Sequence, residues 1–305
     1  MSELVRNRSE ILFLYDVKDA NPNGDPVDEN KPRIDEETGV NIVTDVRLKR
    51  TVRDYLNDYK KKDIFVLEIR DNNGNLKTKE ERLKDFKNNP TEVMKKCIDI
   101  RLFGATTAVE DKTMVLTGPV QFKYGRSLHR VDLTYVKGTT VMPSGAERKQ
   151  GTFTERYILP YSLIAFYGIV NENAAQQQGI QLTEEDISLM LEGMWNGTKN
   201  LISGSKFGQM PRLLIQVMYK EGNFYIGELD KHISLQSDKS THESIRDIAE
   251  VKIDITNLVK ALNDHKDKIE KIRLNVDDRI TFIKDGADAN LKSALSNLTV
   301  EDLTF

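Results

Sequence analysis

The sequence is poor in the residues that build disulfides, metal centres and catalytic triads. Its 305 residues include one cysteine, Cys97, and four histidines. One cysteine excludes an internal disulfide and a cysteine-rich zinc site, which fits a protein of the reducing cytoplasm. We expect Cys97 to be a small buried apolar side chain. The histidines lack metal-ligand spacing, and neither a nucleophile elbow nor a phosphate loop occurs. We therefore predict no catalytic residue, no metal and no cofactor. The histidines are His129, His232, His242 and His265.

Long apolar runs are also missing. No window approaches the roughly 20 apolar residues of a membrane span, and the first residues lack the pattern of a secretory signal. Hydrophobic residues make up 38% of the chain and charged residues 30%, as in globular proteins. We expect a cytoplasmic protein without a membrane partner, built as one elaborated domain or two ordinary ones.

The chain also has no overall positive charge. A net charge of -3 argues against a surface that binds phosphate everywhere, so any nucleic-acid role must depend on local clusters. Residues 44–62 and 121–156 each contain seven Lys or Arg against three acids, and residues 193–220 contain four bases and no acid. Residues 221–305 hold 17 acids against 12 bases. Each basic cluster could also be an ordinary solvated face.

Apolar spacing predicts the first strand and the first helix. Ile11 to Val17 is typical of a central strand, and the turn-rich NPNGDP follows it. Thr44 can cap a helix with one buried face, formed by Leu48, Val52, Tyr55, Leu56 and Tyr59. Lys49, Arg50 and Arg53 lie away from that face, which predicts an exposed basic ridge suited to phosphate.

The remaining pattern predicts an α+β fold. Strands are expected at 115–124, 157–170 and 212–219, and a helix from Thr183 to near Gly204. With two insertions set aside, the order is strand, helix, strand, strand, helix, strand, which is ferredoxin-like. The 60–112 segment looks like an insertion, and the connection of about 30 residues before Tyr157 is long enough to suggest a projecting hairpin. Residues after 221 carry no motif.

Two loops could carry chemistry. Ser203 to Gln209 offers small residues, free amides, hydroxyls and one cation, which suits a phosphate, although an ordinary polar connection can look similar. Asp19 to Asp25 resembles half of a calcium loop, but Asn30 stands where a bidentate glutamate is required, so a tight turn fits better. Metal-assisted RNA cleavage by Asp16, Asp19 or Asp25 stays open.

Seven blocks of the sequence resemble a known family, the backbone subunits of type I CRISPR Cascade complexes in the RAMP superfamily, with subtype I-B the best fit. They lie in order across about residues 8 to 220: RSEILFLYDVKDANPNGDP, NKPRIDEETG, VTDVRLKRTVRDYL, RLFGA, TGPVQFKYGRS, GTFTERYILPYSLIAFYG and SGSKFGQMPRLL. Two features depart from expectation: Gly204 stands where the family often has a second basic residue, and the aromatic signature of RNA-recognition strands is absent.

The resemblance implies an RNA-recognition or ferredoxin-like palm (8–59, 114–126, 157–221). It further implies fingers (60–113), a protruding thumb hairpin (127–156) and a C-terminal elaboration (222–305). It implies a non-catalytic subunit for antiviral defence that oligomerises along CRISPR RNA with other Cascade subunits, while guide pairing captures target DNA. Two alternatives are a metal-dependent RAMP-type endoribonuclease and an assembly protein that does not touch RNA.

The resemblance and the residue chemistry together assign the site. The predicted RNA-binding residues are Asn21, Asn23, Arg47, Lys49, Arg50, Arg53, Ser203, Ser205, Lys206 and Gln209. The predicted thumb residues are Lys137, Val141, Met142, Arg148 and Lys149, whose cations would hold phosphates while the apolar pair separates stacked bases.

Overall fold

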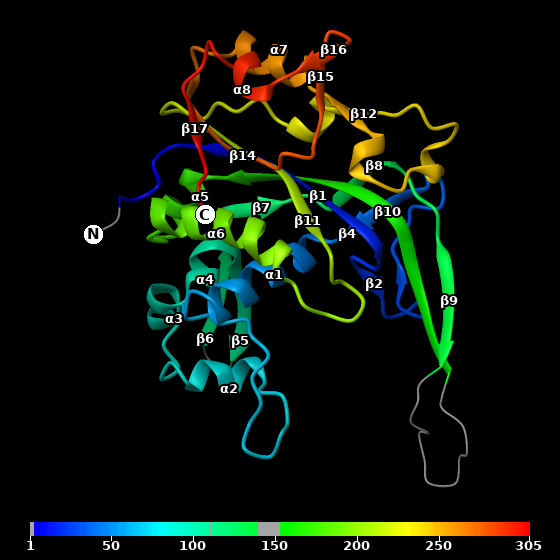
Figure 1. Cartoon of the computed structure of the whole chain (residues 1–305). Helices are drawn as coiled ribbons and strands as arrows, with labels where there is room; N and C mark the ends of the chain where they lie inside the picture. Colours follow the sequence, from blue (N-terminus) through cyan, green and yellow to red (C-terminus); the bar gives the residue numbers. More distant parts are fainter. Residues whose placement is uncertain (1–2, 110–111, 140–152) are drawn as a thin grey trace.

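A nine-stranded sheet forms the centre of the molecule (Figure 1). The structure is a computed structural model that describes residues 3–109, 112–139 and 153–305. The main path of the sheet is β17-β14-β11-β1-β10-β8-β4, while β7 and β9 also pair with β10. The predicted α+β class is confirmed. The strands are β1 Ser9–Ala20, β4 Val40–Val43, β7 Val120–Phe122, β8 Gly125–Arg130, β9 Thr134–Thr139, β10 Phe153–Val170, β11 Met210–Tyr219, β14 Ile269–Val276 and β17 Val300–Asp302.

Strand β1 is the central strand that its apolar run predicts. It pairs antiparallel with β10 on one side and β11 on the other. Its side chains alternate between two hydrophobic cores, so that Ile11 and Phe13 face one core while Leu12 and Leu14 face the other. Both faces of the sheet are therefore covered, which explains why the run is apolar at successive positions.

Helices α1 (Asp45–Asp58) and α6 (Glu184–Lys199) cover one face of the sheet. Both predicted starts are confirmed, and Thr183 forms a capping box with Asp186. Thr44 precedes α1, but its side chain makes no capping bond. Two details are wrong: α6 ends at Lys199 rather than near Gly204, and Tyr59 is exposed because it lies beyond the last turn of α1.

The segment after α1 builds a small subdomain with its own core around Phe65, Leu83 and the buried Cys97. The expected single strand at 115–124 is wrong, because it divides into β6 and β7. Strand β6 pairs with β5 as a separate hairpin. The division falls at Gly118, where a Cβ would lie 2.1 Å from the carbonyl carbon of Phe103. The elements are α2 Lys79–Lys84, α3 Pro90–Lys96, α4 Ile98–Phe103, β5 Gly104–Val109 and β6 Lys112–Thr117.

A C-terminal lobe covers the opposite face of the sheet and lies at the top of Figure 1. Its four-stranded sheet has the order β12-β13-β15-β16. Its elements are η1 Leu229–His232, β12 Ser234–Gln236, η2 His242–Ser244, η3 Ile248–Glu250, β13 Lys252–Asp254, α7 Thr256–Asp264, β15 Phe282–Lys284, β16 Ala287–Ala289 and α8 Leu291–Ala294. Elsewhere lie α5 Glu172–Gln177 and the two-stranded pair β2 Gly24–Asp25 and β3 Lys31–Pro32.

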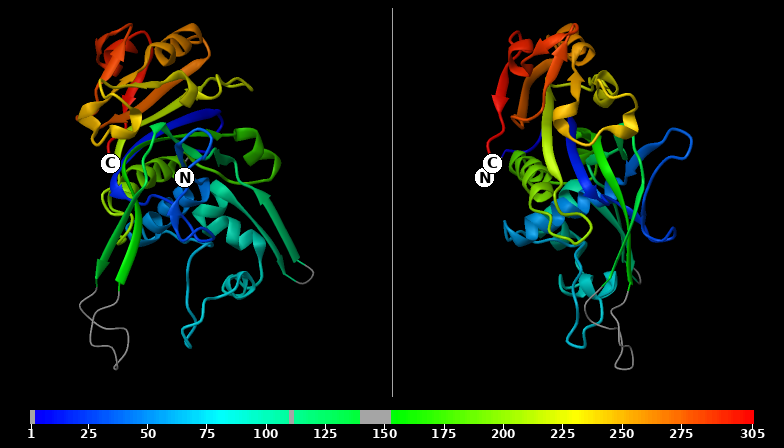
Figure 2. Two further views of the ribbon diagram at one scale, coloured as in Figure 1. Left: turned by 90° about the vertical axis from the view of Figure 1, so that its right-hand side faces the viewer. Right: turned by 45° about the vertical axis from the view of Figure 1, so that its right-hand side comes forward.

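Strand β9 and the first residues of β10 form a two-stranded ribbon, from Thr134–Thr139 and Phe153–Ile158. The ribbon and the β5–β6 hairpin extend from the same end of the molecule (Figure 2). The long connection thus contains β8, within the main sheet, and all of the ribbon except Tyr157 and Ile158. Residues 140–152, with the predicted thumb residues Val141, Met142, Arg148 and Lys149, lie outside the described residues. None of the described helices is long and apolar enough to span a bilayer.

Candidate nucleic-acid interface

Three segments meet where β1 ends: the turn after β1, the first half of α1 and the loop between α6 and β11. The Asn21 backbone amide donates to the Ser205 carbonyl oxygen at 2.8 Å. The backbone amide and the hydroxyl of Thr44 both donate to Asn23 Oδ1 at 2.8 Å. The turn therefore connects the loop to α1. We call this surface the seam, and define it by Asn21, Asn23, Arg47, Ser203, Ser205, Lys206 and Gln209.

Polar atoms in the seam lack partners. Asn21 Oδ1, Arg47 Nε and Gln209 Nε2 are buried and make no hydrogen bond with any residue that the structure describes. The Asn21 amide is oriented by its Nδ2, which donates to the Asn30 carbonyl oxygen at 2.7 Å. A buried polar atom without a partner costs about 1–3 kcal/mol, so most such atoms in folded proteins are satisfied. The seam therefore favours a polar ligand.

The cations of the seam have no carboxylate within ion-pair distance among the described residues. Arg47 Nη2 donates to Thr51 Oγ1 at 3.0 Å, and Lys206 Nζ to Ser205 Oγ at 3.2 Å. Burial lowers the pKa of Lys206, and the nearby Arg47 guanidinium lowers it further. Burial also lowers the pKa of Arg47, although Asp54 opposes this. An anion placed between the two cations would relieve both effects.

The predicted exposed ridge on α1 is wrong for two of its three residues. Lys49 and Arg53 are 9% and 8% exposed. Lys49 Nζ lies 2.8 Å from Asp45 Oδ2, and Arg53 Nε lies 3.0 Å from Oδ2 of the fully buried Asp99. The helical wheel assumed one buried side, whereas α1 is also covered by the segment that carries Asp99. Arg50 does reach solvent, while pairing with Asp54 at 2.7 Å.

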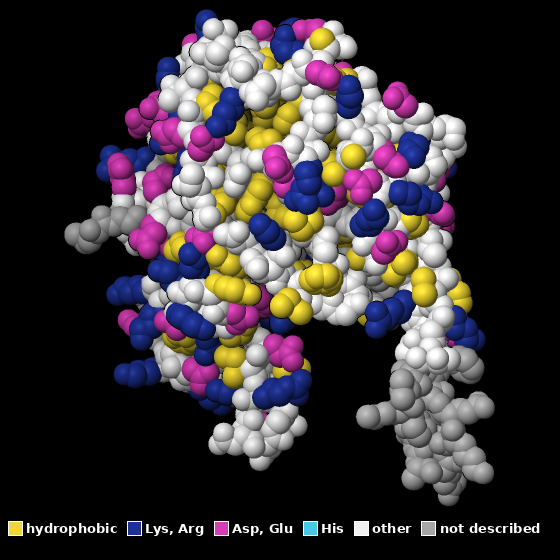
Figure 3. All heavy atoms as spheres, in the orientation of Figure 1, with side chains coloured by type: hydrophobic (Ala, Val, Ile, Leu, Met, Phe, Trp, Pro, Cys, Tyr) yellow, Lys and Arg dark blue, Asp and Glu magenta, His cyan; other side chains and the backbone are white. Residues whose placement is uncertain are grey.

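A groove of about 750 Å³ continues from the seam between α1 and the subdomain at 60–113. Asn23, Thr44 and Arg47 line its near end, and the apolar side chains of Val66 and Leu76 are exposed within it. Lys77, Lys79 and Arg82 contribute cations from the far wall. Lys and Arg side chains are spread over this subdomain at the lower left of Figure 3. The groove would accept a ligand with both apolar and anionic parts.

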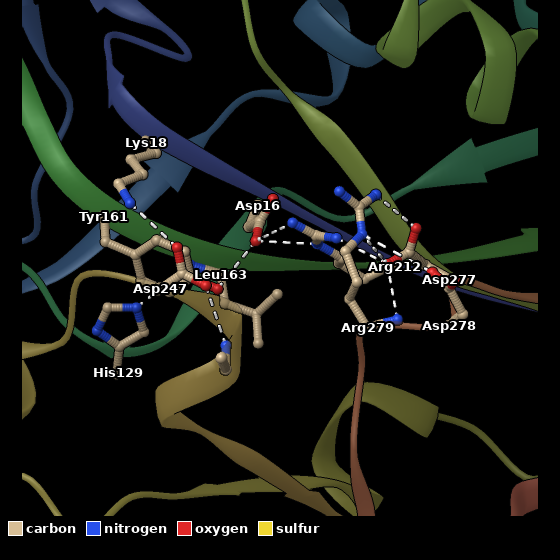
Figure 4. A network of polar contacts seen from close by, with 11 residues as sticks. Asp16, Lys18, His129, Tyr161, Leu163, Arg212, Asp247, Asp277, Asp278 and Arg279 are labelled. Atoms are coloured by element: carbon tan, nitrogen blue, oxygen red, sulfur yellow. Dashed lines mark hydrogen bonds and ion pairs between the residues drawn. The ribbon is translucent and has the colours of Figure 1, made fainter.

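The three aspartates considered for metal binding do not converge. Asp16 is buried and accepts from Arg212 and from the Tyr161 hydroxyl (Figure 4). Asp25 pairs with Arg33, and Asp19 has a left-handed φ of 51°. Within residues 3–109, 112–139 and 153–305, no group of three or more His, Cys, Asp or Glu could hold a metal ion.

The ribbon contributes one contact to the loop of the seam. Arg156 Nη1 donates to the Gly204 carbonyl oxygen at 3.0 Å. Sequence reasoning missed this arginine, because nothing in a strand pattern shows which loop the strand passes. Lys137, the predicted thumb cation that the structure describes, lies 3.7 Å from Glu155.

The fold and the seam define an α+β protein in which an incompletely paired polar surface lies beside a projecting ribbon. The profile of the family "CRISPR-associated protein Cas7" matches residues 7–256. A CRISPR-associated protein Cas7 from Haloferax volcanii is 33% identical over 307 aligned residues, covering 90% of this chain and 88% of that protein. The chain belongs to the CRISPR-associated protein Cas7 family, as the sequence blocks predict.

Two solved structures show the same fold. One, described as a CRISPR RNA-guided surveillance complex, aligns with a TM-score of 0.55 and 15% identity over 97% of this chain and 94% of the matched chain. The other, a CRISPR RNA-guided surveillance complex in a pre-nicking state, aligns with a TM-score of 0.58 and 11% identity over 98% and 96%. At these identities the likeness is one of fold.

Proposed function

We propose that this chain is a non-catalytic backbone subunit that oligomerises along CRISPR RNA in a type I interference complex in the cytoplasm. Its partners would be the guide RNA, further copies of itself, other Cascade subunits and, through guide pairing, target DNA. Family membership supports the class of protein, and the surveillance complexes among the structural relatives support the assembly. The observation that carries RNA binding is that Arg47 and Lys206, on two segments that meet in the seam, bond to the hydroxyls of Thr51 and Ser205 and form no ion pair with a carboxylate of the described residues.

The seam would hold the RNA backbone. Arg47 and Lys206 would neutralise phosphates, while the hydroxyls of Ser203 and Ser205 would fix their position. Asn21 Oδ1 would accept a hydrogen bond from the same RNA strand, and Gln209 Nε2 would donate one to it, since both atoms lack a partner among the described residues. Such contacts leave base edges free, so that pairing reads the target. This mode needs no cofactor. Asn23 would act by orienting the turn, and Arg50 by exchanging Asp54 for a phosphate.

Lys49 and Arg53 were predicted to contact RNA, and their burial changes that proposal. Each is buried and held by a carboxylate, so a phosphate could reach it only after that ion pair broke. We now assign both residues to holding α1 against its neighbours. Arg47 and Arg50, on the same helix, stay in the proposed interface.

The strand order supports the assignment of a palm. β11-β1-β10-β7 are antiparallel neighbours, with α1 and α6 on one face, which is the arrangement of a ferredoxin-like unit. We propose that the subdomain at 60–113 forms the fingers and that the ribbon forms the base of a thumb reaching across 127–156. Lys137, Arg148 and Lys149 would then hold phosphates, while Val141 and Met142 would separate stacked bases.

RNA purified with the protein from its host tests this function. We expect it to contain CRISPR repeat sequence, and we expect the purified chain to bind single-stranded RNA with an affinity that falls as salt rises. Binding no stronger than that of albumin would favour an assembly protein that does not touch RNA.

A metal-dependent ribonuclease is the alternative from another class. Complementary RNA incubated with the protein and a divalent metal should stay intact, and folded alanine variants of Asp16, Asp19 and Asp25 should leave it intact as well. Multiple-turnover cleavage by wild type that any one of these variants abolishes would replace our proposal with the ribonuclease.

A further inference from the structure

Arg156 lies on the ribbon, yet its side chain reaches the seam. It stands opposite Val136 in the ribbon register, and its guanidinium donates to the Gly204 carbonyl oxygen at 3.0 Å. No carboxylate among the described residues forms an ion pair with it, whereas Lys137 on the facing strand lies 3.7 Å from Glu155. The guanidinium has five N–H groups, so one hydrogen bond to a carbonyl oxygen leaves most of its donors available.

The Arg156 guanidinium lies beside residue 204 of the loop, which has no side chain. A Cβ built on Gly204 would lie 3.8 Å from Arg156 Nη2 and would meet no other atom within 4 Å. The ribbon arginine therefore lies beside the position that a side chain on residue 204 would take, at ordinary van der Waals distance. Ser203 and Ser205 flank the same position, and Lys206 follows it.

We propose that Arg156 is a third phosphate-binding cation of the seam, supplied by the ribbon in place of a side chain at residue 204. This rests on the proposed RNA binding. With Arg47 from α1 and Lys206 from the loop, three elements would each give one cation to the same stretch of RNA backbone. Arginine suits this place because its planar fork can keep the carbonyl bond while it donates to two phosphate oxygens.

A salt titration of RNA affinity tests the proposal. In Arg156→Ala the slope of log affinity against log salt should fall by about 0.7, which is one phosphate contact on a single strand. Arg156→Gln should lower the slope equally, since it can still donate to the Gly204 carbonyl oxygen but has no charge. The matched control is Arg130→Ala, an exposed arginine on β8 that pairs with Glu243 at 3.0 Å, and its slope should equal that of wild type.

A rescue variant tests the position. Arg156→Ala combined with Gly204→Arg moves the guanidinium from the ribbon to the loop, where Arg156 Nη2 is the one atom of the described residues within 4 Å of the new Cβ and is itself removed by the first change. We expect this double variant to regain the slope of wild type. Unchanged slopes in both single variants, or no recovery in the double variant, would overturn the proposal. Absence of salt-dependent RNA binding in wild type would instead overturn the proposed function. Thermal unfolding checks that each variant is folded.

Discussion

Two polar clusters lie beside β1, and they differ in how completely their groups are paired. On the lobe side, Asp16 accepts from Arg212, Arg212 also pairs with Asp277, and Asp277 pairs in turn with Arg279 (Figure 4). At the end of the same strand, the seam contains two cations without a carboxylate partner in the described chain and three unpartnered buried atoms. A paired cluster holds elements together, whereas an incomplete one suits a ligand. Side-chain type does not distinguish the two clusters, because each contains an arginine, Arg212 in one and Arg47 in the other.

The largest effect should come from breaking the paired cluster. Arg212→Ala leaves the buried Asp16 without its cation, which should lower the free energy of unfolding by roughly 3–5 kcal/mol. Arg279→Ala is the matched control, because its side chain is half exposed and it serves the same Asp277, so it should cost under about 1 kcal/mol. Urea unfolding measures both. Equal losses of stability in the two variants would show that the buried Arg212–Asp16 pair contributes no more than the half-exposed Arg279–Asp277 pair.

The strongly patterned elements were predictable, while the pairing of charges was not. β1, α1 and α6 follow from apolar spacing and capping residues that lie next to each other in the sequence. The partner of Arg53 is Asp99, which lies 46 residues away in a segment whose packing the helical wheel cannot show. Arg156 and Gly204 are 48 residues apart. Arg47, Lys206 and Gln209 could be proposed from the sequence, but their lack of partners required the fold.

The second effect concerns His129, whose ring stacks on Tyr161 in the paired cluster. Its Nε2 accepts from the Leu163 backbone amide at 3.2 Å, and burial lowers its pKa to about 4. The folded state therefore binds this proton less readily than the unfolded chain, whose histidine titrates near 6.5. Stability is fully present above pH 6.5 and is lost as the pH falls through 4, by roughly 3 kcal/mol.

Unfolding by urea at several pH values measures this loss. His129→Gln cannot titrate, so its free energy of unfolding should decline less than that of wild type between pH 6.5 and 4. Parallel declines in the two proteins would assign the acid sensitivity to carboxylates elsewhere.

The third effect should appear in RNA binding rather than in stability. Arg47→Ala combined with Lys206→Ala removes both cations of the seam, so the salt slope should fall by about 1.4 and RNA affinity at moderate salt by at least roughly tenfold. The free energy of unfolding should stay within about 0.5 kcal/mol, because no ion pair is broken. The control is Lys252→Ala with Lys260→Ala, two exposed cations of the C-terminal lobe that pair with Asp288 and Asp264. A large stability loss in the seam variant would make the seam another structural cluster.

The smallest effect separates two neighbours on α1. Lys49 is buried and its ammonium is held by Asp45 and by Gln121 Oε1, at 2.8 and 3.4 Å. Arg50 is 42% exposed at its side chain, its nearer partner Asp54 lies on the same helix surface, and Glu68 lies 4.0 Å from its guanidinium. A phosphate can therefore replace Asp54 with little desolvation, whereas it would have to open a covered ion pair to reach Lys49.

Arg50→Ala should lower the salt slope by about 0.7, and Lys49→Ala should leave it unchanged. Lys49→Ala should instead cost about 1 kcal/mol of stability, a small loss because Asp45 stays favoured by the N-terminal end of the helix dipole. Equal slope changes in both variants would mean that paired, buried cations also contact RNA, and pairing would then no longer distinguish the two clusters.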